Sequence, residues 1–153
     1  MIPFRQHTVG DISLSVPQDW MVSENVTDTV IAAAAPHRDG HFTANVVVTV
    51  DEIFAGETLV GWAQRTVAAL TQQVLRLRVL DLEDTEIDRR PARRVLSHYP
   101  LPGHGGVSLE QWLLSDGPRG VILSCSTAAL EYDDRADLFA EVAAGLRVAG
   151  SAR

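Results

Sequence analysis

Histidines and one acidic residue in a short loop are the side chains of this chain best suited to bind a metal ion. His37 and His41 lie four residues apart in segment 36–41, with Asp39 between them. Imidazole nitrogens and carboxylates are ligands that zinc accepts, and a site needs at least three of them converging. This spacing matches no established zinc pattern. We therefore predict no metal and no cofactor, and keep His37, Asp39 and His41 as the candidate ligands if one exists.

No nucleophile of the chain stands in a setting that would activate it. The single cysteine, Cys125, lies in the apolar run 121–125, whereas a reactive thiolate needs a nearby imidazole or helix N-terminus. Ser124 and Ser126 lack the Gly-x-Ser-x-Gly turn that presents a catalytic serine. The glycine-rich segment 102–106 falls between two predicted strands, not before a helix, where phosphate-binding loops lie. These residues predict a protein that is not an enzyme.

Composition predicts a folded domain with a sizeable core. The chain has 153 residues, of which 46% are hydrophobic and 22% charged. We expect one α+β domain over 1–148 and a frayed tail over 149–153. All 13 basic residues are arginine, which indicates GC-rich coding and a bacterial source. The net charge of −7 disfavours nucleic acid as a partner, because phosphate backbones are repelled at long range.

Two further features predict where the protein is found. No apolar run approaches the length that spans a bilayer, and the N-terminus shows no export signal, so we expect no membrane insertion. A single cysteine cannot form an internal disulfide, which is compatible with a reducing compartment. The sequence therefore predicts a cytoplasmic location.

Alternation of apolar and polar residues predicts mostly strands, interrupted by two segments with helical spacing. Strands are expected at 4–9, 12–16, 30–35, 45–50, 76–82, 91–99, 107–114 and 120–128. Helices are expected at 58–73 and 135–146, the second capped by Asp133 or Asp134. The acidic segment 81–88 is expected to include a solvated turn. This order favours an α+β fold with antiparallel strands.

Three tryptophans dominate the expected core. We predict that the core includes Val16, Trp20, Val48, Trp112, Cys125 and Phe139. Trp62 falls near the margin of the first helix. If it is exposed beside Leu59 and Val60, these three residues mark a partner-binding surface, because exposed aromatic and apolar side chains gather at protein interfaces.

Four segments together resemble a known superfamily. They are 12–20 with its Val-Pro-x-x-Trp turn, the helix 58–70 following the strand 44–51, the strand 109–112 and the helix 138–142. The chain resembles the PsbP-like and Mog-type proteins, nearest to bacterial DcrB-like, LpqN-like and type VI secretion effector-adaptor proteins. The resemblance implies a twisted antiparallel sheet of about six to eight strands flanked by two main helices, in the order β-β-β-β-α-β-β-β-β-α. A helix-grip, START-like domain is the alternative fold.

The resemblance also implies a class of function. Members of this superfamily are mostly binding or chaperone-like modules, so we expect a non-enzymatic adaptor that binds another protein. The expected partner is a hydrophobic segment of a secreted effector, with a homodimer as a further possibility. Odd-numbered residues of the later strands should then form an exposed apolar groove. Two alternatives stay open: a small-molecule or lipid-binding domain with a cavity between sheet and helix, and an enzyme that uses the histidine-containing loop.

Overall fold

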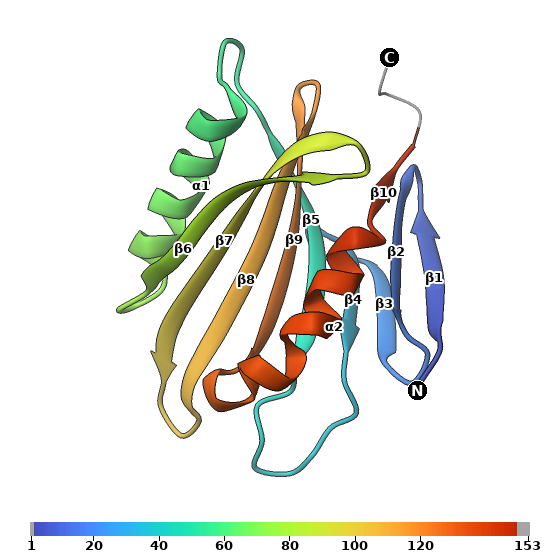
Figure 1. The fold of residues 1–153 in the computed structure, drawn as a ribbon, viewed down its shortest axis with the longest axis vertical. Helices are drawn as coiled ribbons and strands as arrows, with labels where there is room; N and C mark the ends of the chain where they lie inside the picture. Colours follow the sequence, from blue (N-terminus) through green and yellow to red (C-terminus); the bar gives the residue numbers. More distant parts are fainter. Residues whose placement is uncertain (1, 150–153) are drawn as a thin grey trace.

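The protein is an α+β fold of two helices and ten strands, seen in a computed structural model that describes residues 2–149 (Figure 1). Seven strands form the main antiparallel sheet, in the spatial order β3-β4-β5-β9-β8-β7-β6, and three form a smaller sheet, β1-β2-β10. The main-sheet strands are β3 (Met21–Val26), β4 (Thr29–Ala34), β5 (Asn45–Glu52), β6 (Arg78–Ile87), β7 (Arg90–Leu101), β8 (Gly105–Asp116) and β9 (Arg119–Ala128). The small sheet contains β1 (Phe4–Val9), β2 (Ile12–Pro17) and β10 (Arg147–Val148). The fold class and sheet type expected from the sequence are confirmed.

Helix α1 (Leu59–Gln73) covers one face of the main sheet. Its N-cap is Thr58, whose hydroxyl oxygen accepts a hydrogen bond from the Gly61 backbone N at 3.0 Å. Trp62 is fully buried and packs onto Gly120 of β9. The core beneath α1 contains Ile53, Trp62, Ala63, Val95, Leu113 and Ile122.

Helix α2 (Tyr132–Ala144) covers the opposite face. Neighbouring residues of a strand point to opposite faces of its sheet, and on β8 Trp112 packs under α2 whereas Leu113 packs under α1. The larger core, under α2 and the small sheet, contains Val16, Trp20, Val48, Trp112, Cys125 and Phe139 among others. No helix among residues 2–149 has the length and apolar character that crossing a bilayer requires.

The start of α2 differs from the sequence-based prediction. A 3-10 turn, η1 (Ala129–Glu131), runs directly into α2, so Asp133 and Asp134 lie in its first turn and neither caps it. The preceding residue, Glu131, makes no side-chain capping bond. The two aspartates still carry negative charge near the positive end of the helix dipole, which stabilises the helix without a cap.

Three strand predictions need correction. Strands β3 and β10 were not predicted, and the segment 81–88, expected to be a turn, is strand as far as Ile87. The actual turn between β6 and β7 is Asp88-Arg89, where both residues have positive φ, 52° and 64°. This conformation matches the twist of a two-residue hairpin, but it is uncommon for residues other than glycine, asparagine and aspartate.

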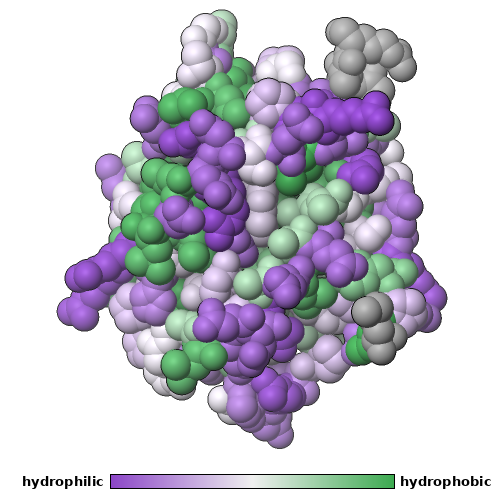
Figure 2. Space-filling model, viewed as in Figure 1, coloured by the Kyte–Doolittle hydropathy of each residue, from purple (hydrophilic) through white to green (hydrophobic). Residues whose placement is uncertain are grey.

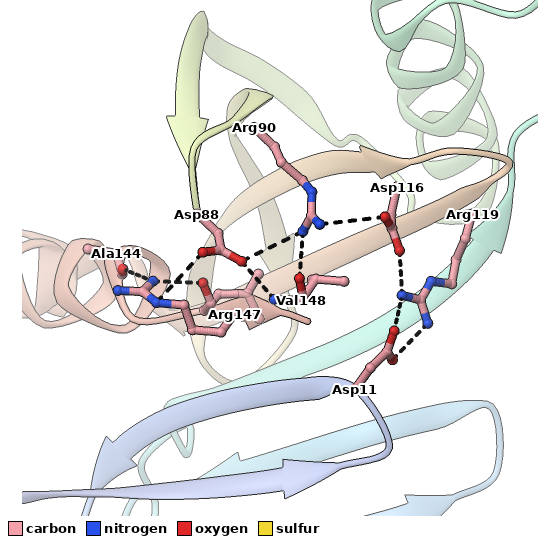
Figure 3. A network of polar contacts seen from close by, with 9 residues as sticks. Asp11, Asp88, Arg90, Asp116, Arg119, Ala144, Arg147 and Val148 are labelled. Atoms are coloured by element: carbon pink, nitrogen blue, oxygen red, sulfur yellow. Dashed lines mark hydrogen bonds and ion pairs between the residues drawn. The ribbon is translucent and has the colours of Figure 1, made fainter. Parts of the chain in front are cut away.

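A network of ion pairs joins the small sheet to the ends of the main-sheet hairpins (Figure 3). Arg119 pairs with Asp11 at 2.7 Å and also with Asp116, and Arg90 lies 3.7 Å from Asp116. Arg90 also donates to the backbone oxygen of Val148 at 2.8 Å. Because Arg90 and Asp116 are buried, the network fixes β10 and the β1–β2 turn against the main sheet.

The same region limits the predicted frayed tail. The Ala149 backbone N donates to the backbone carbonyl oxygen of Asp11 at 2.8 Å, so the first residue of the tail continues the contact between β10 and the β1–β2 turn. The rest of the predicted tail, 150–153, lies outside the described residues.

Asp11 makes part of this network sensitive to acid. Hydrogen bonds from Arg119 lower the pKa of Asp11 below its usual 3.8. A carboxylate with a lowered folded-state pKa stabilises the fold above its unfolded-state pKa and loses that effect as pH falls through the folded value. We expect wild type to be more stable than Asp11→Asn near neutral pH, with the difference shrinking below pH 3.8. Urea unfolding at several pH values measures it, and a difference that grows on acidification would contradict it.

Candidate functional site

The histidine-containing loop does not bring its candidate ligands together. His37 Nε2 lies 3.1 Å from Asp39 Oδ1, but His41 instead faces Glu131, with 3.9 Å between Nδ1 and Oε2. The side chains of His37, Asp39 and His41 are all exposed to solvent. Across residues 2–149, no group of three or more His, Cys, Asp or Glu side chains is arranged to hold a metal ion.

Cys125 lies on β9 inside the core under α2. Its side chain is fully buried, and burial raises the pKa of the thiol well above its usual value of 9.0, with a further contribution from the charge of Glu110. A raised pKa keeps the sulfur in the protonated, unreactive form. Cys125 is therefore placed as a packing residue and cannot meet a substrate at the surface.

The expected partner surface at the start of α1 needs correction. Trp62 is 0% exposed, and its Nε1 donates to Asp51 Oδ2 at 2.9 Å. Its ring faces the sheet because Gly120 leaves room for it, so no partner can touch it. Val60 is exposed and Leu59 half-buried. That Leu59 and Val60 bind a partner stays a prediction, and Trp62 no longer belongs to the predicted surface.

The odd-numbered residues of the later strands do not form an exposed groove. On β8, Leu113 belongs to the core under α1, and on β9 Val121, Leu123 and Cys125 belong to the core under α2. The buried residues concerned are Val107, Leu109, Leu113, Val121, Leu123 and Cys125. Because both helices lie over these strands, a surface that could bind a segment of another protein lies at the edge of the sheet instead.

Strand β6 is an edge of the main sheet and is rich in exposed apolar side chains. Within residues 2–149, β6 hydrogen-bonds to β7 alone, so its outer backbone groups face away from the sheet. Leu80 is 61% exposed and Leu82 48%, and the register shifts at Leu80. Leu75, in the connection from α1, is 80% exposed. Figure 2 shows hydrophobic surface on the left of the view, where β6 and α1 lie in Figure 1.

Acidic residues follow Leu80 along the exposed length of β6. They are Asp81, Glu83, Asp84 and Glu86. Asp84 pairs with Arg93 of β7 at 2.6 Å, while Asp81 and Glu83 share Arg94 at 3.0 and 3.4 Å. The edge therefore combines an apolar end with an acidic end. Natural edge strands use such charges to prevent uncontrolled pairing with other sheets.

A cavity of about 770 Å³ opens between the N-terminal strands, the loop after β4 and the first half of α2. Its apolar lining includes Ile2, Phe4, Pro17, Trp20, Pro36 and Leu138. Its charged lining consists of Arg38 and Arg135, which both also contact Glu131, and of the carboxylates Asp19, Asp137 and Glu141. Trp20 thus belongs to the core and also lines the cavity. Its size is within the range of small-molecule sites.

Arg94 and Glu110 form a largely buried ion pair under α2. Arg94 Nε donates to Glu110 Oε2 at 2.5 Å, and Arg94 Nη2 lies 3.4 Å from the Tyr132 hydroxyl. Burial opposes the charge of Arg94, but the bonds to Glu110 and Tyr132 outweigh it and raise the pKa of the guanidinium. Burial also raises the pKa of Tyr132. The sequence pattern did not predict this pair, because Arg94 and Glu110 are 16 residues apart and meet only through the pairing of β7 with β8.

Sequence comparisons identify no relatives. No protein-family model matches the chain, and no curated protein matches it. Likeness appears only at the level of three-dimensional structure.

Structural comparison finds several proteins with the same architecture. The solution structure of the cyanobacterial PsbP, CyanoP, from Synechocystis sp. PCC 6803 is 16% identical, with 97% of this chain and 94% of that chain covered and a TM-score of 0.71. The Ran-binding protein Mog1p of Saccharomyces cerevisiae is 16% identical over 97% and 96%, with a TM-score of 0.69. LpqN of Mycobacterium tuberculosis, described as involved in cell envelope biogenesis, is 12% identical over 97% and 92%, with a TM-score of 0.70. This chain therefore has the PsbP/Mog-like fold.

Proposed function

We propose that this protein is a non-enzymatic binding module, an adaptor of the chaperone-like kind, that receives an extended apolar segment of another protein along β6. The observation that carries the proposal is the open edge of β6 with Leu80 and Leu82 exposed on it. An added strand gains backbone hydrogen bonds from such an edge and specificity from alternate side chains. A Ran-binding protein with the same fold supports a protein partner, and the expected partner is a secreted effector met in the cytoplasm.

A second copy of this chain is a poor occupant of the same edge. β6 carries four carboxylates among its ten residues. Pairing β6 antiparallel with itself along its whole length would set Asp81 opposite Asp84, and like charges directly opposite each other are destabilising. Any homodimer is therefore proposed to use another surface.

The test of this proposal compares the two edges of the main sheet. The variant Leu80→Lys/Leu82→Lys places charge on β6, and Met21→Lys/Val26→Lys does the same on β3, where Met21 is 79% exposed. Affinity purification from the cells that encode the protein, followed by hydrogen exchange on the purified complex, should recover a partner that protects β6 amides. The β6 variant should weaken that complex about tenfold or more, the loss expected when anchoring apolar contacts are removed.

Three results would overturn the proposal. They are recovery of no protein partner, equal binding by the β6 variant, and protection confined to other elements. The β3 variant should bind as wild type does, because Met21 and Val26 lie at the opposite edge.

The 770 Å³ cavity supports a second candidate function, the binding of an apolar small molecule or lipid. 1-Dodecanol is a suitable probe, because its alkyl chain fits the apolar lining and it carries no charge that Asp19, Asp137 and Glu141 would repel. Leu138→Arg should abolish binding measured by calorimetry, since it puts a charge into the lining. Leu130→Arg is the matched control, because Leu130 is 98% exposed and outside the cavity. Equal binding by wild type and Leu138→Arg would remove this candidate.

A further inference from the structure

A second cleft, called here the α2 cleft, lies between α2 and strands β6–β8. It has a volume of about 410 Å³. Its helix side contains alanines at 136, 140, 143 and 144, together with Tyr132 and Asp137. The short side chains of the four alanines present aliphatic surface to the cleft. The opposite side is acidic and includes Glu83, Glu86 and Glu110.

The α2 cleft has an excess of negative charge. Among the described residues that line it, Arg94 is the one basic side chain. Glu110 and Glu83 both pair with Arg94, and so does Asp81 nearby. One guanidinium thus faces three carboxylates. Two more carboxylates, Glu86 and Asp137, belong to the same lining. A cation entering this cleft would find charges that Arg94 alone does not neutralise.

One carboxylate oxygen in the cleft lacks a hydrogen-bond donor. Glu110 is 3% exposed, and its Oε2 accepts from Arg94. Its Oε1 is buried and has no hydrogen-bond partner among the described residues. An unsatisfied buried acceptor costs about 1–3 kcal/mol, and more when it is charged. The Tyr132 side chain also interacts with the Glu110 carboxylate, and both residues line the cleft. An N–H group that enters the cleft would supply the donor that Oε1 lacks.

We propose that the α2 cleft binds an alkyl ammonium or alkyl guanidinium group. The aliphatic stem lies along the alanines of α2, and the cationic head lies among Glu83, Glu86 and Glu110. Lysine and arginine side chains combine these two parts, since their stems pack on apolar surface while their heads seek charge partners. Free amines such as agmatine share the chemistry. The lining of the cleft includes Glu83 and Glu86 of β6 but neither Leu80 nor Leu82, so the variants that test strand addition leave this site intact and the two proposals are tested separately.

The binding experiment titrates the whole chain with each of three probes and monitors binding by the NMR shifts of its backbone amides. Agmatine represents a free amine, and N-acetyl-arginine N-methylamide represents an arginine side chain of a protein. N-acetyl-citrulline N-methylamide has the same shape without the charge. We expect the cationic probes to shift the amides of Ala136, Ala140 and Tyr132, and the citrulline probe not to. Binding of agmatine alone assigns the site to free amines, and binding of the arginine probe assigns it to a protein side chain.

Variants test the site without disturbing the buried ion pair. Ala140→Leu should weaken binding about tenfold or more, because the leucine side chain would occupy the space that the aliphatic stem needs. Ala68→Leu on the exposed side of α1 is the matched control and should bind as wild type does. Glu86→Gln, at an exposed position, should also weaken binding. Any of three results overturns the proposal. They are equal affinity for the citrulline probe and the arginine probe, wild-type affinity in Ala140→Leu, and no change in the NMR shifts of α2 amides with either cationic probe.

Discussion

Replacing Arg94 with methionine is expected to lower the free energy of unfolding by about 3–5 kcal/mol, the range measured when one partner of a buried ion pair is removed. Glu110 has only 4% of its side chain exposed and takes its charge partner from Arg94. Without the guanidinium, a carboxylate remains buried beneath α2 with no compensating charge. Urea unfolding followed by tryptophan fluorescence measures the change.

Arg93→Met is the matched control for this prediction. Arg93 is the neighbour of Arg94 on the same strand and pairs with Asp84, but that carboxylate is 79% exposed. Exposed ion pairs contribute about 0–1 kcal/mol, so this variant should lose far less. The double variant Arg94→Met/Glu110→Leu should recover much of the loss, because the stranded charge is gone. Equal losses for Arg94→Met and Arg93→Met would show that the buried pair has no special role.

Replacing Gly120 with alanine is expected to destabilise the fold by about 1–3 kcal/mol, the usual effect of overpacking a core. A Cβ at this position would lie 2.2 Å from Trp62 Cζ2 and 2.5 Å from Cη2. The ring cannot move away easily, because it is fully buried and its nitrogen is bound to Asp51. Calorimetric or urea unfolding measures the loss.

Gly145→Ala provides the control, because a Cβ there meets its nearest atoms at 3.6 Å, an ordinary contact distance. A double-mutant cycle gives a sharper test. In a Trp62→Leu background the clash disappears, so Gly120→Ala should cost clearly less than in wild type. An unchanged cost would mean that the tryptophan is not the reason for the glycine.

The sequence predicted the long, periodic elements well and failed where tertiary context decides. Strand β2 and helix α1 match their predicted ranges closely, because β2 alternates apolar and polar residues and α1 has helically spaced apolar residues. β10 has two residues and therefore no period to detect. β3 is mostly exposed, with Ser23, Glu24 and Asn25 in its middle, which are weak strand formers.

The candidate sites were less predictable than the fold. The apolar residues near Leu80 were visible in the sequence, but their exposure depends on β6 being an edge, which follows from the whole strand order. The α2 cleft unites residues of three strands and one helix. Trp62 illustrates the reverse error, since its position near a helix end indicated a margin, whereas Gly120 of a distant strand admits it to the core.

The pairing of β10 with β2 has a consequence for how the protein folds. The register joins Ser13 to Arg147 and Ile12 to Val148, so strands from opposite ends of the chain become neighbours. Such long-range contacts close large loops and form late, which slows folding. On the ribosome, the β1–β2 hairpin emerges long before β10, its third strand. The hairpin therefore waits with one edge unpaired until β10 has been synthesised, and truncation before Arg147 should leave that edge open to other chains.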